Sequence, residues 1–375
     1  LFRSVGFGIF TLASIGCGLA NSMTLLITMR IIQGIGAALL IPTSLTLIRL
    51  SFDDPDKRRS AVALWGACGG IALAAGPVIG GLMIEYFGWR SVFLLNTPIG
   101  LLAILLILKY APASPRVDKH IDIPGQVSIA ICLASLTYGL TESSAQGWVS
   151  ATLSAMALAL ICAVAFIWIE RRVEHPMLPA RLARNKVLGS MALAGAAINL
   201  TFYGTVFVFS IYFQTFLHYD ALKTGLSFIP LTAVLTLSTL LSSRFAKRFS
   251  ATRIIATGFT VQIVGFIALS QITSHSSLWL LNGALMLVGI GSAMSVPSIT
   301  NAMLSSVTQH DAGIASGLMA SARQLGGVIG VVVSGAMITG SDAVAFSQGM
   351  SNAMLLSALA LLVCIGVILY VSRRP

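Results

Sequence analysis

The sequence predicts an all-α polytopic membrane protein. Apolar residues make up 56% of the 375 residues and only 9% carry a charge, whereas soluble domains carry roughly 25% charged residues. A water-soluble chain of this length could not cover its surface with so few charges. Uninterrupted apolar stretches of about 20 residues, the length that crosses a bilayer as a helix, recur along the whole chain. Together these observations exclude a soluble fold.

Twelve such runs lie between polar or charged breaks, and we expect each to form a transmembrane helix. They occupy residues 4–20, 24–48, 61–84, 90–109, 124–142, 150–170, 188–216, 224–243, 252–271, 277–300, 313–338 and 350–371. Several contain glycine or proline, which membrane helices tolerate because neighbouring helices cover the freed backbone groups.

The basic residues predict the orientation in the membrane. Of the 23 lysines and arginines, 19 lie in or beside alternate loops and the tail, and Arg90 and Lys223 lie on the other side. Cytoplasmic loops carry an excess of Lys and Arg. We therefore expect a multi-pass protein of the cytoplasmic (inner) membrane with both ends of this chain in the cytoplasm. The basic loops lack interleaved aromatic residues, so nucleic acid is not an expected partner.

An internal repeat indicates how the runs are organised. Gly34-Ile-Gly-Ala-Ala leads to Pro42, and Gly289-Ile-Gly-Ser-Ala leads to Pro297, both with an offset of 255 residues. Short GxG matches also arise by chance, but a true parallel repeat relates the halves of many transporters. If the second and tenth runs are each the fourth helix of a six-helix half, two helices precede this chain and runs five and six are an insertion.

The repeat therefore predicts a fourteen-helix parent of which this chain contains helices three to fourteen. We expect residues 1–109 to form four of the six helices of an N-terminal bundle. Residues 110–187 would form an inserted two-helix linker with cytoplasmic loops, and residues 188–375 a C-terminal six-helix bundle.

Arg30 and Gln33 are polar residues inside the second run, directly before Gly34. An arginine in mid-membrane costs about 2.5–3.5 kcal/mol on insertion scales, so it must face protein or water. The repeat copy has Leu285 and Val288 at the equivalent positions, which makes the polar pair specific to one half. We interpret Arg30 as a charge that assists protonation switching of a nearby carboxylate; a purely structural hydrogen-bonding role is the alternative.

The third run contains Gly76-Pro77-Val-Ile-Gly80-Gly81. Small residues at this spacing let two helix backbones approach closely, and the proline bends the helix. The motif is typical of a hinge or of a sealed helix interface.

Both motifs resemble signatures of the major facilitator superfamily, namely its fourth-helix arginine motif and its fifth-helix antiporter motif. Further stretches resemble the fourteen-helix drug:proton antiporter branch, the multidrug efflux permeases. They are Trp89-Arg90 with Phe93, Asn96 and Pro98; Gly147-Trp148; Tyr212-Phe-Gln214 with Gly225 and Pro230; and Arg323-Gln324-Leu-Gly326-Gly327. The resemblance covers essentially the whole chain and implies the major facilitator fold, here without the family's first two helices.

The resemblance implies proton-coupled export of lipophilic, often cationic, toxic compounds by alternating access, and hence antibiotic resistance. It implies no bound cofactor, because the proton gradient supplies the energy. Expected partners are small lipophilic substrates, protons, the lipid bilayer and, through an adaptor, an outer-membrane efflux channel. The family's acidic first-helix residue and its loop between helices two and three lie outside this chain. Ser243–Ser250 is a degenerate second copy of that loop, to which we assign no gating role.

The seventh run carries a polar stripe that we interpret as a substrate cavity. Asn199, Tyr203, Ser210 and Gln214 fall within about 60° of arc at 3.6 residues per turn, and Phe207 borders them. Aromatic faces beside neutral hydrogen-bonding groups suit lipophilic cations. The alternative is an interhelical hydrogen-bond seam that only holds the bundle together.

Other function classes are less consistent with the sequence. It contains no GxxxxGK[ST] loop, no GxSxG motif, no CxxC pair and no HExxH pattern, so neither an enzyme nor a metal site is expected. A specific metabolite exporter and a non-transporting membrane sensor stay open as alternatives.

Overall fold

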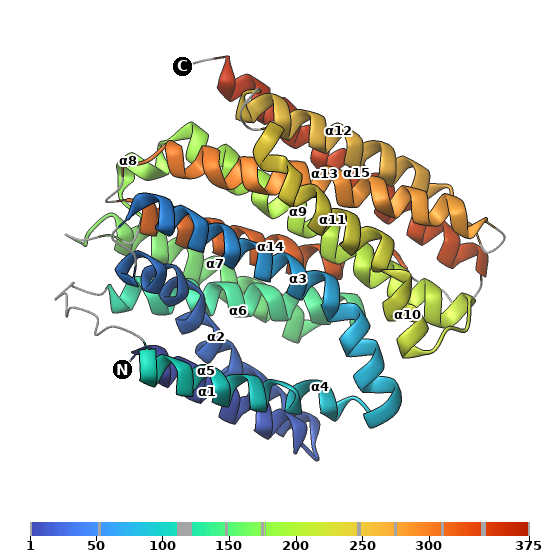
Figure 1. The fold of residues 1–375 in the computed structure, drawn as a ribbon, viewed down its shortest axis with the longest axis horizontal. Helices are drawn as coiled ribbons and strands as arrows, with labels where there is room; N and C mark the ends of the chain where they lie inside the picture. The colour runs from blue at the N-terminus through green and yellow to red at the C-terminus, as the bar shows by residue number, and fades with distance from the viewer. Residues whose placement is uncertain are drawn as a thin grey trace. The chain divides into compact units, whose positions relative to one another are not determined.

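The computed structural model describes residues 2–51, 54–110, 122–146, 149–173, 176, 178–245, 249–273, 276–308, 311–338 and 343–373. Within them the chain is helical, with fifteen α-helices and one π-helical turn (Figure 1). It divides into two compact units, unit 1 with Leu1–Val117 and Tyr219–Ile229, and unit 2 with Asp118–His218 and Pro230–Pro375. The three-part division expected from the repeat stays a prediction.

Unit 1 contains the first five helices and a short helix from later in the chain. Its elements are α1 (Phe2–Gly18), α2 (Met23–Ser51), α3 (Pro55–Phe87), α4 (Arg90–Leu94), α5 (Asn96–Tyr110) and α10 (Ala221–Ser227). α1 packs along α2 and also contacts α4 and α5, while α10 packs on α3.

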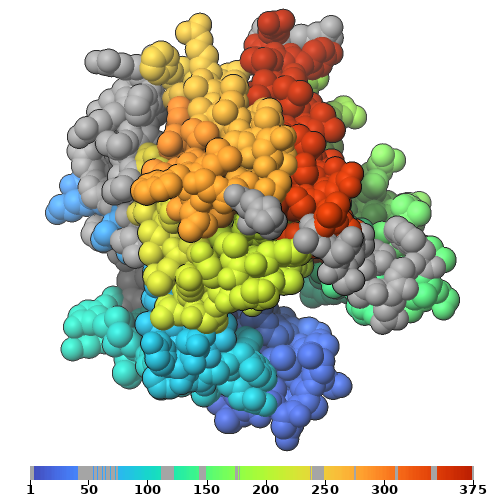
Figure 2. All heavy atoms as spheres, turned by 90° about the vertical axis from the view of Figure 1, so that its right-hand side faces the viewer, coloured from blue at the N-terminus to red at the C-terminus, as the bar shows by residue number. Residues whose placement is uncertain are grey.

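Unit 2 contains the remaining helices. They are α6 (Ile123–Gln146), α7 (Ser150–Glu170), α8 (Ala180–Ala183), α9 (Lys186–Ile211), the π-helical turn η1 (Tyr212–Phe216), α11 (Ile229–Phe245), α12 (Ala251–Ser270), α13 (Leu278–Ser305), α14 (Ala312–Met337) and α15 (Ala343–Ser372). α9 packs on α14, α12 on α13, and α15 on α12. In Figure 2 the red surface of α15 lies beside the golden surface of α12.

Each of the twelve predicted runs coincides with helical structure. Nine runs are single helices; the fourth is α4 with α5, the seventh α9 with η1, and the eighth α10 with α11. The observed helix ends differ most from the predicted ends where the sequence is polar. α3 begins at Pro55 and not at residue 61, and α15 begins at Ala343 and not at residue 350. A helix can extend beyond the hydrocarbon core, whereas an apolar run marks only the part within it.

Nine helices or helix pairs in the described part of the chain are long and apolar enough to cross a membrane. Two shorter apolar helices, Ser4–Gly18 and Ala75–Phe87, accompany them. The all-helical membrane fold is therefore confirmed, and twelve crossings stay a prediction.

Glycine sets the close helix contacts in unit 2. A Cβ atom added to Gly326 or Gly330 of α14 would overlap the backbone carbonyl oxygens of Ala196 and Leu200 in α9. Small residues let membrane helices approach to backbone contact. α9 and α14 therefore form a tight pair.

Candidate functional site

Ser14 is the centre of a polar network in unit 1. Its hydroxyl donates to the carbonyl oxygen of Phe93 at 2.9 Å and accepts from Gln33 Nε2 at 2.8 Å and Asn96 Nδ2 at 3.0 Å. Ser14 is fully buried and Gln33 is 3% exposed. One serine of α1 thus joins α2 to the junction between α4 and α5.

Arg30 extends this network toward the surface of the unit. Its Nη1 donates to Gln33 Oε1 at 2.7 Å, and the guanidinium lies 5.6 Å from the centroid of the Phe93 ring. Arg30 and Gln33 are neighbours because residues three apart share a helix face. The predicted pair is therefore together in space, whereas Gly34 has open space around it among the described residues.

Glycine also brings α1 and α2 close enough for this network. A Cβ atom at Gly36 would lie 2.7 Å from the backbone nitrogen of Phe10, and one at Gly100 of α5 would overlap Thr11. These glycines place the backbone of α1 against both partners. Ser14, one turn further along α1, then reaches α2 and the α4–α5 junction.

The antiporter motif of α3 divides into two kinds of glycine. A Cβ atom at Gly81 would overlap the carbonyl oxygen of Ala221 in α10, and one at Gly225 of α10 would overlap the carbonyl oxygen of Pro77. A Cβ atom added at Gly76 or Gly80 would have no described atom within 4 Å. Gly81 and Pro77 therefore lie in a backbone-to-backbone contact with α10, and the other two motif glycines do not.

The first half of the polar stripe on α9 faces α14. Asn199, 8% exposed, accepts a hydrogen bond from Arg323 Nε at 3.2 Å. A Cβ atom at Gly327 would lie 2.9 Å from the ring of Tyr203, and one at Gly335 would lie 3.4 Å from the ring of Phe207. Both aromatic rings thus cover glycines of α14, and Tyr203 keeps 40% of its surface exposed.

The second half of the stripe lies beyond that helix pair. The Ser210 hydroxyl donates to the carbonyl of Val206 on its own helix at 2.6 Å, and Gln214 is exposed in η1. α14 ends at Met337, shortly after the glycine opposite Phe207. The structure therefore does not bring Ser210 and Gln214 to Arg323, and the role of the five residues as a cavity stays a prediction.

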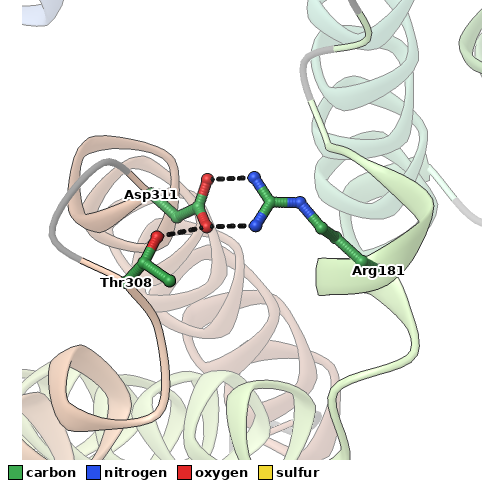
Figure 3. A network of polar contacts seen from close by, with 3 residues as sticks. All are labelled: Arg181, Thr308 and Asp311. Carbon is green, nitrogen blue, oxygen red and sulfur yellow. Dashed lines mark hydrogen bonds and ion pairs between the residues drawn. The ribbon is translucent and has the colours of Figure 1, made fainter.

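An ion pair connects the short helix α8 of unit 2 to the loop between α13 and α14 (Figure 3). Arg181 of α8 donates from Nη1 and Nη2 to the two carboxylate oxygens of Asp311, each at 2.7 Å. Thr308 donates to the same carboxylate at 2.7 Å. Beside it, Asn185 caps α9 by accepting from the backbone nitrogen atoms of Val187 and Leu188, as an N-cap asparagine does.

Sequence reasoning missed several of these partners. The sequence does not distinguish Ser14, because serine is common in membrane helices and Ser14 belongs to no recognisable motif. Asn199 lies in the polar stripe and Arg323 in a family motif, but 124 residues separate them and the sequence does not pair them. Arg181 and Asp311 are 130 residues apart, and no local pattern joins them.

The helical fold defines the chain as a multi-pass membrane protein. The sequence model described as Major Facilitator Superfamily matches residues 2–331. The chain therefore belongs to the major facilitator superfamily, a family of membrane transporters.

Curated relatives of similar sequence are resistance and export proteins. The methylenomycin A resistance protein of Streptomyces coelicolor is 30% identical over 89% of this chain and 70% of its own length. The multidrug resistance protein Stp of Mycobacterium tuberculosis is 33% identical over 89% of this chain and 62% of its own. The cephamycin export protein CmcT of Amycolatopsis lactamdurans is 33% identical over 88% and 69%. The chain thus spans about two thirds of the length of these relatives.

A solved structure agrees with the fold. It is a bacterial homologue of the human lysosomal transporter Spinster in an inward-facing and occupied conformation, with a TM-score of 0.66 and 15% identity. The match covers 99% of this chain and 82% of that one. This likeness shows the fold alone.

Proposed function

We propose that this chain exports lipophilic drugs and other toxic compounds, cationic ones among them, across the cytoplasmic membrane in exchange for protons. The names of the relatives support export of antibiotics and other drugs. Membership of the family makes the chain a transporter. The coupling to protons and the nature of the substrates are what we propose.

The observation that carries the proton coupling is the fixed position of Arg30. Its guanidinium is hydrogen-bonded to Gln33, which is held in turn by the buried hydroxyl of Ser14. A cation kept in one place in a membrane interior strongly favours the charged form of any carboxylate that approaches it. Moving a carboxylate toward or away from Arg30 would therefore bind or release a proton during the transport cycle.

Substitution of Arg30 tests this mechanism in the full-length protein. Arg30→Ala should abolish drug efflux driven by an imposed pH gradient while the protein still reaches the membrane. Arg30→Lys should restore part of the efflux, because lysine keeps the charge but loses the planar fork that binds Gln33. Wild-type efflux by Arg30→Ala would leave only a structural role for this residue.

We also propose that the basic loops lie in the cytoplasm and that the spans correspond to helices three to fourteen of a fourteen-helix transporter. The positive charge of the alternate loops supports the first point and the internal repeat supports the second. In a cysteine-free background, a single cysteine at residue 58 or 248 should resist an impermeant thiol reagent in intact cells. A cysteine at residue 274 or 342 should react, and the reverse pattern would overturn the orientation.

A further inference from the structure

Arg323 is a cation inside unit 2 to which the proposed proton cycle assigns no role. It lies near the middle of α14, where a charged side chain is costly unless it faces protein, water or a ligand. Three of the helices near it, α9, α13 and α14, contain no aspartate or glutamate. Within these three helices no acidic side chain neutralises its charge.

One neutral side chain orients the guanidinium. Nε donates to Asn199 Oδ1 at 3.2 Å, the one hydrogen bond that Arg323 makes among the described residues. Gly195 leaves room for the arginine stem, since a Cβ atom there would lie 3.3 Å from Arg323 Cγ. With Nε held, the two terminal nitrogen atoms keep their hydrogen-bond donors for another partner.

The guanidinium borders a small cavity between α9, α13 and α14. The cavity measures about 10 Å³ and is lined mainly by apolar side chains, with Thr300 of α13 adding a hydroxyl. That is about the room one water molecule needs. Met319 forms part of the wall, and its flexible thioether can move aside for a larger group.

We propose that Arg323, oriented by Asn199, is an anion-binding subsite that takes the carboxylate of a lipophilic substrate. A planar guanidinium with free terminal donors matches a carboxylate in bidentate geometry. The apolar side chains of the wall can contact the atoms that adjoin the carboxylate, and a larger group needs Met319 to move aside. The inference rests on the proposed export function and extends its substrates from lipophilic cations to lipophilic acids.

Equilibrium binding without a proton gradient separates this inference from the proposed function. The full-length protein in nanodiscs is titrated with 2-naphthoate and with its neutral isostere 2-naphthamide. The wild type should bind the carboxylate more tightly. Arg323→Gln should weaken 2-naphthoate binding about tenfold or more, and 2-naphthamide binding less than about twofold, because only the anion loses an ionic hydrogen bond. Arg172→Gln removes an exposed positive charge elsewhere and should change neither affinity.

Asn199→Asp is a second variant, which separates the loss of carboxylate binding from a general folding defect. It places an anion directly on Arg323, so the protein should stay folded and lose its preference for 2-naphthoate. Unchanged carboxylate affinity in Asn199→Asp, or equal loss of both ligands in Arg323→Gln, would show that the pair only ties α9 to α14. Carboxylate binding in a protein without proton-driven efflux would support the subsite and overturn the proposed function.

Discussion

The carboxylate of Asp311, 1% exposed, is held by both terminal nitrogen atoms of Arg181, whose side chain is 58% exposed. The pair fastens the short helix α8, just before α9, to the loop between α13 and α14. One buried acid therefore fixes the start of α9 to the start of α14.

Breaking this ion pair should lower stability. Arg181→Gln should cost about 1–2 kcal/mol, because a buried carboxylate loses charged hydrogen bonds while the arginine itself was partly solvated. Thermal unfolding in detergent measures the loss. Arg184→Gln, in the same segment, is the control and should leave the Tm unchanged. In a double-mutant cycle with Asp311→Asn, fully additive losses would contradict a direct coupling.

The two kinds of motif glycine should respond differently to alanine. Gly81→Ala places a methyl group against the Ala221 carbonyl and should destabilise the protein by about 1–3 kcal/mol and reduce export. Gly80→Ala meets no described atom and should be neutral or gain up to about 1 kcal/mol of helix propensity. Thermal unfolding and drug efflux check both; equal effects of the two variants would refute the assignment of the contact to Gly81.

Removing the hydroxyl of Ser14 should disorder the environment of Arg30. Ser14→Ala leaves the amides of Gln33 and Asn96 without their acceptor, which should cost about 1–2 kcal/mol in the membrane. Proton-driven efflux should fall part of the way toward that of Arg30→Ala. Thr28→Ala is the matched control, because the Thr28 hydroxyl bonds only the Thr24 carbonyl of its own helix in the described structure. Normal efflux by Ser14→Ala would show that Arg30 does not depend on this network.

The α9 stripe should affect selectivity if it lines the transport path. Tyr203→Ala and Gln214→Ala should change the relative resistance of cells to different drugs at normal expression, because aromatic and polar contacts differ between substrates. Susceptibility profiles and membrane expression levels are the measurements. Equal loss against every drug with poor expression would identify the stripe as packing.

The sequence predicted the positions of the helices better than it predicted which side chains of different helices contact one another. Apolar runs located every long helix because the length of a bilayer crossing is a strong constraint. The break at Leu95 and the π-helical turn at Tyr212–Phe216 were not predicted, since neither interrupts the hydropathy. The predicted stripe assumes 3.6 residues per turn as far as Gln214. Gln214 lies in the π-helical turn, where bonding from i to i+5 changes the rotation per residue, so its predicted direction does not hold. Tertiary pairs such as Asn199–Arg323 need the fold, because no local pattern encodes them.

Backbone contact between α9 and α14 limits how this transporter can evolve. Any substitution at Gly326 or Gly330 introduces a Cβ atom that collides with a carbonyl oxygen of the facing helix. Selection with a new drug therefore cannot use these positions without loss of folding. Tyr203, half-exposed over Gly327, can shrink or change polarity while the two backbones keep their distance. Resistance variants that arise under laboratory selection should accumulate at Tyr203 and leave the two glycines untouched.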